Sequence, residues 1–98
     1  MLNEVFLQGR ISEHVEEVEI SGDRYVRFRL KVLREESGSD SINCLVNDKA
    51  HEKIVRHGVD APDSFDISLA GRIQTRFFKV GGTVAAVTEV VVHDLVKI

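Results

Sequence analysis

The segment from Arg24 to Arg34 alternates between apolar and polar side chains along nearly its whole length. A β-strand points successive side chains to opposite faces, whereas a helix would scatter both classes around its surface. The alternation therefore predicts a long strand with one apolar and one cationic face. The apolar face comprises Val26, Phe28, Leu30 and Val32, and the other comprises Tyr25, Arg27, Arg29 and Lys31. The cations would follow one another at roughly 6.5–7 Å, which fits either an anion-binding row or an ordinary solvated strand face.

Further alternating segments predict strands at residues 4–11, 42–46, 65–78 and 83–98. The first pattern resumes weakly as far as residue 20, as in a strand that continues past a kink. Gly9 in this strand predicts a bulge or a close backbone approach. In the segment 65–78, parity places Phe77 in the core and Phe78 on the outer side.

Turn-forming residues separate these strands, with hairpin turns predicted at residues 21–23 and 79–83 and loops at 35–40 and 59–64. Residues 48–57 form the one predicted helix. Asp48 is suited to cap its first turn, and Gly58 is suited to end it. The helix therefore falls between the third and fourth strands.

This order of elements predicts an all-β protein, a five-stranded Greek-key barrel of the OB type with one helix between strands three and four. The chain of 98 residues would form a single OB-fold domain, residues 1–98, with a modest core. A small open sandwich has the same order of elements. In an OB barrel, strands two and three and the neighbouring loops form the usual binding face.

Composition excludes several classes of protein. The net charge of −3 argues against attraction of nucleic acid by overall charge. The acids are segregated, however, and residues 24–34 contain five cations and no acid, so a local basic face is possible. No apolar run approaches the ~20 residues that cross a membrane, and no signal peptide precedes the first strand. We therefore expect a cytoplasmic protein.

The chain shows no motif for catalysis or for a cofactor. Its four histidines, residues 14, 51, 57 and 93, lack metal-binding spacing. Cys44 is the only cysteine, which excludes an internal disulfide, and its parity makes it an inert core residue. We expect neither a metal site nor an enzyme.

Three motifs resemble those of bacterial single-stranded DNA-binding proteins. Residues 3–11 resemble the family's opening N-x-V-x-L-x-G-x-L/I, residues 71–76 resemble its G-x-L-x-T-R, and residues 88–92 resemble its T-E-V-V-V. They occur in the expected order, so the resemblance covers nearly the whole chain. The short length, without an acidic tail after Ile98, also resembles primosomal replication protein N, a dimeric relative with the same fold.

The resemblance implies a homo-oligomer, either a dimer or a tetramer, that binds single-stranded DNA without sequence preference in replication, repair or recombination. It also implies contacts with replication or repair proteins. Phe78 lies where the family commonly has a stacking tryptophan, and we expect Phe6 at a subunit interface. The predicted DNA-binding residues are cations in and beside the two long strands, with two aromatic residues: Arg10, Tyr25, Arg27, Arg29, Lys31, Arg34, Arg72, Arg76, Phe78 and Lys79.

The chain departs from the family's pattern in its aromatic residues. It has no tryptophan, Ser41 and Asn47 stand where the family often has stacking rings, and the loop around Glu36 lacks another. Each stacked base contributes ~1–3 kcal/mol, and cations make binding salt-dependent. We therefore expect weaker and more salt-sensitive binding than is usual in the family. The alternative is a diverged OB scaffold with weak DNA affinity that works by protein contact, as a primosome-like assembly module or as the partner of a full-length paralogue.

Overall fold

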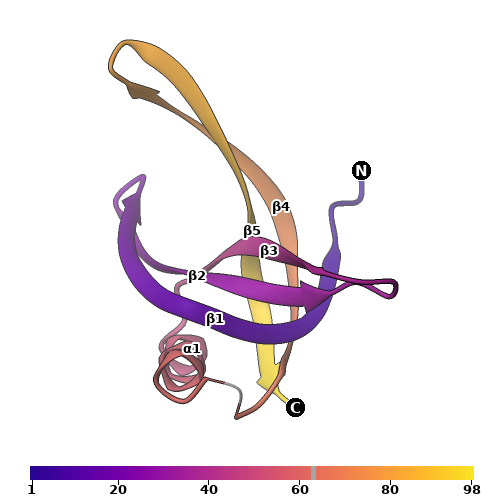
Figure 1. The fold of residues 1–98 in the computed structure, drawn as a ribbon. Helices are drawn as coiled ribbons and strands as arrows, with labels where there is room; N and C mark the ends of the chain where they lie inside the picture. The colour runs from indigo at the N-terminus through magenta and orange to yellow at the C-terminus, as the bar shows by residue number, and fades with distance from the viewer. Residues whose placement is uncertain (63) are drawn as a thin grey trace.

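The computed structural model describes residues 1–62 and 64–98, with every side chain among them except that of Glu13. These residues form, in chain order, β1 (Val5–Ile20), β2 (Asp23–Leu33), β3 (Ser39–Val46), α1 (Lys49–Asp60), β4 (Ile67–Val80) and β5 (Thr83–Lys97). The strands close into a barrel in the order β1-β2-β3-β5-β4 (Figure 1). The predicted all-β class is confirmed, and the sheet is closed rather than an open sandwich.

Strand β1 closes the barrel because its two halves pair with different neighbours. Residues 5–9 pair with β4, and residues 10–20 pair with β2. The register with β2 shifts within residues 12–16, which is the predicted kink in one continuous strand. At Gly9, an added Cβ atom would overlap the carbonyl oxygen of Lys31. The close backbone approach expected at this glycine is therefore confirmed.

The barrel interior is filled by the side chains that the alternating pattern of the strands predicted to face inward. Val26, Phe28 and Leu30 are at most 1% exposed, as the alternation in β2 predicted. Strand β3 contributes Cys44 to the same core and pairs in parallel with β5. Burial raises the pKa of the Cys44 thiol to about 12, so the thiol stays protonated and unreactive at neutral pH. The predicted inert core cysteine is thus confirmed.

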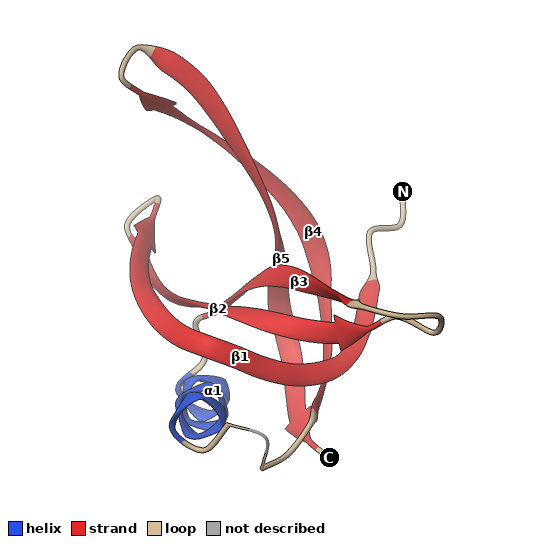
Figure 2. Cartoon of the chain, viewed as in Figure 1, coloured by secondary structure: helices blue, strands red, loops and turns tan. Residues whose placement is uncertain are grey.

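Helix α1 lies beside one end of the barrel and packs against β1 and β5 (Figure 2). The carboxylate of Asp48 caps it, accepting hydrogen bonds of 2.8 and 3.1 Å from backbone N–H groups of the first turn. The predicted end at Gly58 is wrong, because the helix continues to Asp60. Gly58 is buried, and a Cβ atom there would lie 2.7 Å from Cδ1 of Ile11. This glycine therefore permits close packing of the helix on β1. The predicted loop at 59–64 also includes Asp63, which lies outside the described residues.

Both predicted hairpin turns have the backbone conformation that a two-residue turn requires. Ser21 and Gly22 have φ values of 51° and 84°, and Gly81 and Gly82 have values of 56° and 82°. Two successive positive φ angles match the twist of the flanking strands. The first turn joins β1 to β2, and the second joins β4 to β5.

The hairpin of β4 and β5 extends well beyond the barrel (Figure 1), and residues 73–88 are termed the arm below. The parity prediction for one side of this arm is wrong. Ile73 and Phe77 share the parity of the buried Ile67, but they are 48% and 73% exposed. The reason is that the strand has left the barrel, so this side no longer faces a core. Strand β4 also begins later than predicted, although Phe65, just before it, is buried.

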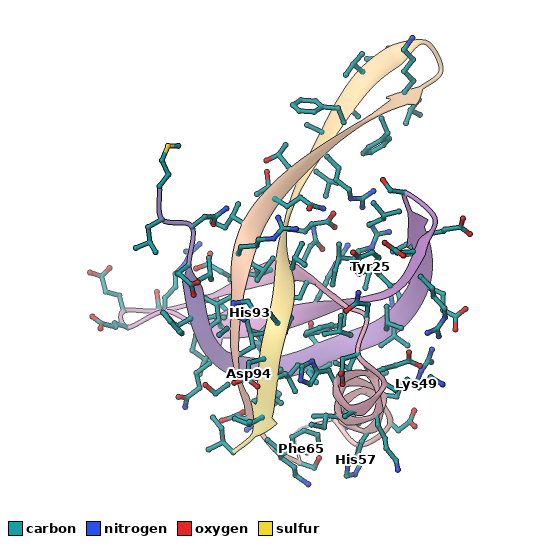
Figure 3. The ribbon with its side chains drawn as sticks, turned by 180° about the vertical axis from the view of Figure 1, so that it is seen from behind. Tyr25, Lys49, His57, Phe65, His93 and Asp94 are labelled. Carbon is teal, nitrogen blue, oxygen red and sulfur yellow. The ribbon has the colours of Figure 1, made fainter. Side chains whose placement is uncertain are left out.

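Within the described residues, no helix has the length and apolar character needed to span a bilayer. The same residues contain no group of three or more His, Cys, Asp or Glu side chains placed to hold a metal ion. His57 lies instead against the ring of Phe65, with ring centroids 5.2 Å apart (Figure 3).

Candidate nucleic-acid interface

The cationic side of β2 lies outside the barrel, on a face that continues into its neighbours. Arg29 pairs with Ser12 of β1 and with Asn43 of β3, and Lys31 pairs with Ser41 of β3. Directly opposite residues point to the same side of a sheet. The cations of β2 therefore stand among short polar side chains, and both Arg29 and Lys31 are exposed. This side of the sheet is termed the outer face.

The outer face continues across β5 to β4 and adds cations that are remote in sequence. Arg27 pairs with Leu45, Leu45 pairs with Val91, and Val91 pairs with Arg72. Arg27 and Arg72 consequently lie on the same face, on either side of two apolar side chains. Arg76 has the same parity as Arg72 and lies within the arm. The structure thus brings the cations of both long strands onto one surface, which the sequence could not show.

Half of the predicted DNA-binding cations are engaged by carboxylates of the chain itself. The ion pairs are Arg10–Asp66 at 2.9 Å, Arg27–Glu16 at 2.9 Å, Arg34–Asp40 at 2.7 Å, and Arg76–Glu89. The others, Arg29, Lys31, Arg72 and Lys79, form no ion pair with any described residue. A cation attracts a phosphate weakly until its own carboxylate is displaced. The attractive charge of the outer face therefore comes from Arg29, Lys31 and Arg72.

Arg76 differs from the other cations because its partner is buried. Glu89 is 1% exposed, and both of its oxygens accept hydrogen bonds from the Arg76 guanidinium. These bonds raise the pKa of Arg76. Arg76 is therefore the counter-ion of the buried Glu89 carboxylate as well as a candidate for DNA contact. Sequence reasoning missed the role of Glu89, although a glutamate inside a valine-rich strand is a signal for a buried ion pair.

The predicted aromatic residues lie near the junction of the arm and the β1–β2 hairpin. Phe78 is 44% exposed and lines a cavity of about 400 Å³ between these two hairpins. Arg27 and Arg76 line the same cavity, so a base stacked on Phe78 would have cations beside it. Tyr25, marked in Figure 3, is half-buried and pairs with Val18 of β1. Of the two rings, Phe78 is the more accessible to a base.

Three predicted residues lie apart from this cluster. Arg34 follows β2 and is bound to Asp40 of β3, so it bridges the ends of the connecting loop. Lys79 has the parity of Phe77 and therefore points to the other side of the arm from Phe78. Arg10 lines a second cavity together with Lys31, at the opposite end of β2 from the arm.

Sequence reasoning also missed a polar hollow on the outer face. It is lined by His14, Glu16, Arg27, Phe28, Arg29 and Asn43. In the sequence, His14 and Glu16 belong to an acidic run that looks like a solvated segment. Arg27 holds the carboxylate of Glu16 through a hydrogen bond and lowers its pKa, so this group is ionised at neutral pH.

Comparison with known proteins gives a clear result for the fold. No family model matches the sequence, and no curated protein matches it. The SSB of Plasmodium falciparum in complex with ssDNA has 18% identity and a TM-score of 0.75 over 100% of this chain and 96% of that chain. A mitochondrial single-stranded DNA binding protein from S. cerevisiae has 14% identity and a TM-score of 0.70, over 99% and 96%. The dimeric N-terminal domain of PriB from Thermoanaerobacter tencongensis has 16% identity and a TM-score of 0.66, over 98% and 96%.

This chain has the fold of these proteins. The resemblance that the three sequence motifs indicated is thereby confirmed at the level of the fold. Identity below 20% leaves few shared side chains. The function of the outer face therefore depends on the residues of this chain.

Proposed function

We propose that the chain binds single-stranded DNA without sequence preference, through the outer face of an OB-type Greek-key barrel. The observation that carries this proposal is the grouping of Arg29, Lys31 and Arg72. These cations are exposed and have no carboxylate partner among the described residues, on a face that also exposes Phe78. Cations that follow the backbone and a ring that stacks on bases are what strand binding without sequence preference requires.

The fold supports the same conclusion, because one structural neighbour is an SSB in complex with ssDNA. Binding of this kind shelters or positions a strand and needs no catalytic group. We further propose that it serves replication, repair or recombination, through contacts with proteins of those processes.

The test is a fluorescence anisotropy titration of labelled oligo-dT of about 30 nucleotides at several salt concentrations, with a duplex as control. Each phosphate contact contributes about −0.7 to the slope of log K against log salt for single strands, so each lost contact makes the slope shallower by this amount. The triple variant Arg29→Ala/Lys31→Ala/Arg72→Ala should therefore bind more weakly, and its slope should be shallower by about 2. The matched control is Lys49→Ala/Lys53→Ala, which removes exposed cations from α1. Unchanged affinity and slope in the triple variant would refute the proposal.

A second candidate function is protein contact, and the arm favours it. Phe77, Val80 and Val84 are 73%, 60% and 61% exposed, so this hairpin presents apolar side chains to solvent. Phe6 on β1 is 76% exposed, which agrees with its predicted place at a subunit interface. We therefore propose a homo-oligomer in either case. Light scattering that shows a stable assembly, together with negligible affinity for oligo-dT at low salt, would favour the protein-contact module.

A further inference from the structure

The polar hollow on the outer face lies where β1 and β2 lose their regular pairing. Ser12 pairs with Arg29 and Glu16 pairs with Arg27, so residues 13–15 of β1 stand opposite Phe28 alone. An insertion of this kind bends the bulged strand and re-aims its side chains. The resulting cavity has a volume of about 190 Å³. It belongs to the same surface as the cations that carry the proposed function.

The size of this cavity fits one nucleobase ring. A cavity of about 150 Å³ in another protein accepts benzene when its walls are apolar. The hollow at the bulge is somewhat larger, and its lining is polar, with His14, Glu16, Arg27, Arg29 and Asn43 among its residues. A heteroaromatic base with hydrogen-bonding edges therefore suits it better than a hydrocarbon.

The lining offers both donors and a fixed acceptor. Arg29 has no ion pair within the described chain, so its guanidinium is available to donate. Glu16 accepts a hydrogen bond of 2.9 Å from Arg27 through Oε2, and its Oε1 accepts none from a described residue. The bond to Arg27 restrains the carboxylate, which leaves Oε1 as a preorganised acceptor. A ligand that matches this lining has an acceptor edge and, separately, a donor edge.

Guanine meets this requirement most fully, because it has two adjacent acceptors and two adjacent donor groups. Its N7 and O6 form an acceptor edge that arginine binds through two hydrogen bonds, and its N1–H and N2–H₂ groups form a donor edge. Adenine and thymine place a donor between two acceptors. Cytosine is the nearest competitor, with N3 and O2 as acceptors, but N4–H₂ is its only donor group, whereas guanine offers two donor groups to the carboxylate. We infer that the hollow binds one guanine of the strand, with Arg29 donating to N7 and O6 and with Glu16 Oε1 accepting from the N1–H and N2–H₂ edge. This inference rests on the proposed function. It adds one base-selective position to a face that otherwise binds single strands without sequence preference.

The experiment compares anisotropy titrations of the wild-type protein with 15-nucleotide strands that differ at one central position. The strands are all-thymine, or carry one guanine, adenine, cytosine, hypoxanthine or 7-deazaguanine. Hypoxanthine lacks the N2 amino group, and 7-deazaguanine lacks the N7 acceptor. One bidentate contact to a base is worth at least about fivefold in discrimination. We expect the guanine strand to bind at least about fivefold more tightly than the thymine, adenine and cytosine strands, with an intermediate affinity for each guanine analogue.

The Glu16→Gln variant gives a readout that damage to the fold cannot imitate. Removal of the carboxylate releases Arg27, so affinity for every strand should rise, while the preference for guanine should fall, because an amide oxygen that Arg27 does not hold is a weaker acceptor than the carboxylate. A damaged fold would lower affinity for all strands. Equal affinity of the wild type for the thymine and guanine strands would overturn the inference and leave the proposed function standing. An adenine strand that binds as well as the guanine strand would also overturn it, because purine stacking would then explain the preference. Failure to bind any strand would refute the proposed function itself.

Discussion

The Arg76→Ala variant should lose stability, because Arg76 is the counter-ion of the buried Glu89. The side chain of Glu89 is fully buried, whereas 25% of the Arg76 side chain is exposed. Truncation of the arginine leaves a buried carboxylate without its counter-ion, which typically costs 3–5 kcal/mol. Because Arg76 is partly exposed, water can reach Glu89 in the variant, so we expect the lower end, about 3 kcal/mol. For a domain of this size the melting temperature should fall by roughly 12–24 °C.

The assay is thermal unfolding followed by circular dichroism, at equal protein concentrations because self-association shifts Tm. Arg72→Ala is the matched control, since Arg72 lies on the same strand and face, is exposed, and has no ion pair with a described residue. Its stability should change by no more than about 0.5 kcal/mol. The double variant Arg76→Ala/Glu89→Gln removes the buried charge and should recover most of the loss. Equal melting temperatures for Arg76→Ala and Arg72→Ala would refute this reasoning.

Three further predictions concern acid stability, helix packing and stacking. Hydrogen bonds from two arginines lower the pKa of Glu52 from 4.5 to about 2, so the stability it contributes is present above pH 4.5 and is lost as the pH falls toward 2. Glu52→Gln should therefore flatten the acid side of a plot of Tm against pH. Gly58→Ala should cost about 1–3 kcal/mol in urea unfolding, because its Cβ would crowd Cδ1 of Ile11, and should cost less in an Ile11→Val background. Phe78→Ala should weaken oligo-dT binding by about 1–3 kcal/mol in an anisotropy titration, whereas Phe77→Ala, on the other side of the arm, should not.

Each of these predictions has an outcome that contradicts it. If the acid side of the plot of Tm against pH is unchanged in Glu52→Gln, other carboxylates control acid unfolding. If Gly58→Ala is as stable as the wild type in both backgrounds, the helix can move away from β1 without cost. Equal loss of binding in Phe78→Ala and Phe77→Ala would attribute the effect to the arm as a whole, and stacking on Phe78 would be rejected.

Much of the fold is predictable because strands that separate a core from solvent must alternate. The pattern of β2 holds along the strand, since its inner side faces the barrel interior and its outer side faces water. The same reasoning fails at Phe77, because parity gives the side of the strand and not whether a core lies there. The prediction that the helix ends at Gly58 fails for a related reason. A glycine near a helix end fits both a terminus and a close contact, and only the position of Ile11 decides between them.

The candidate site is less predictable, because its electrostatics depend on contacts between strands. Arg72 and Arg76 look alike in the sequence, yet one has no ion pair with a described residue and the other holds a buried carboxylate. The partners of Arg27 and Arg76 are 11 and 13 residues away in the chain. Only the register of the hairpins brings those carboxylates to the cations. A sequence therefore shows where cations lie, but not which of them are already neutralised.

This neutralisation changes what the number of cations implies for salt dependence. Eight phosphate contacts would give a slope of log K against log salt near −6, whereas the three unpaired cations of the outer face, Arg29, Lys31 and Arg72, imply a slope near −2. A phosphate that reaches Arg27 must displace Glu16, so it replaces one ion pair with another. Glu16→Gln should therefore steepen the slope by about 0.7 and raise affinity. A wild-type slope near −6 would show that DNA displaces the carboxylates, and the paired cations would then belong to the binding surface as fully as the unpaired ones.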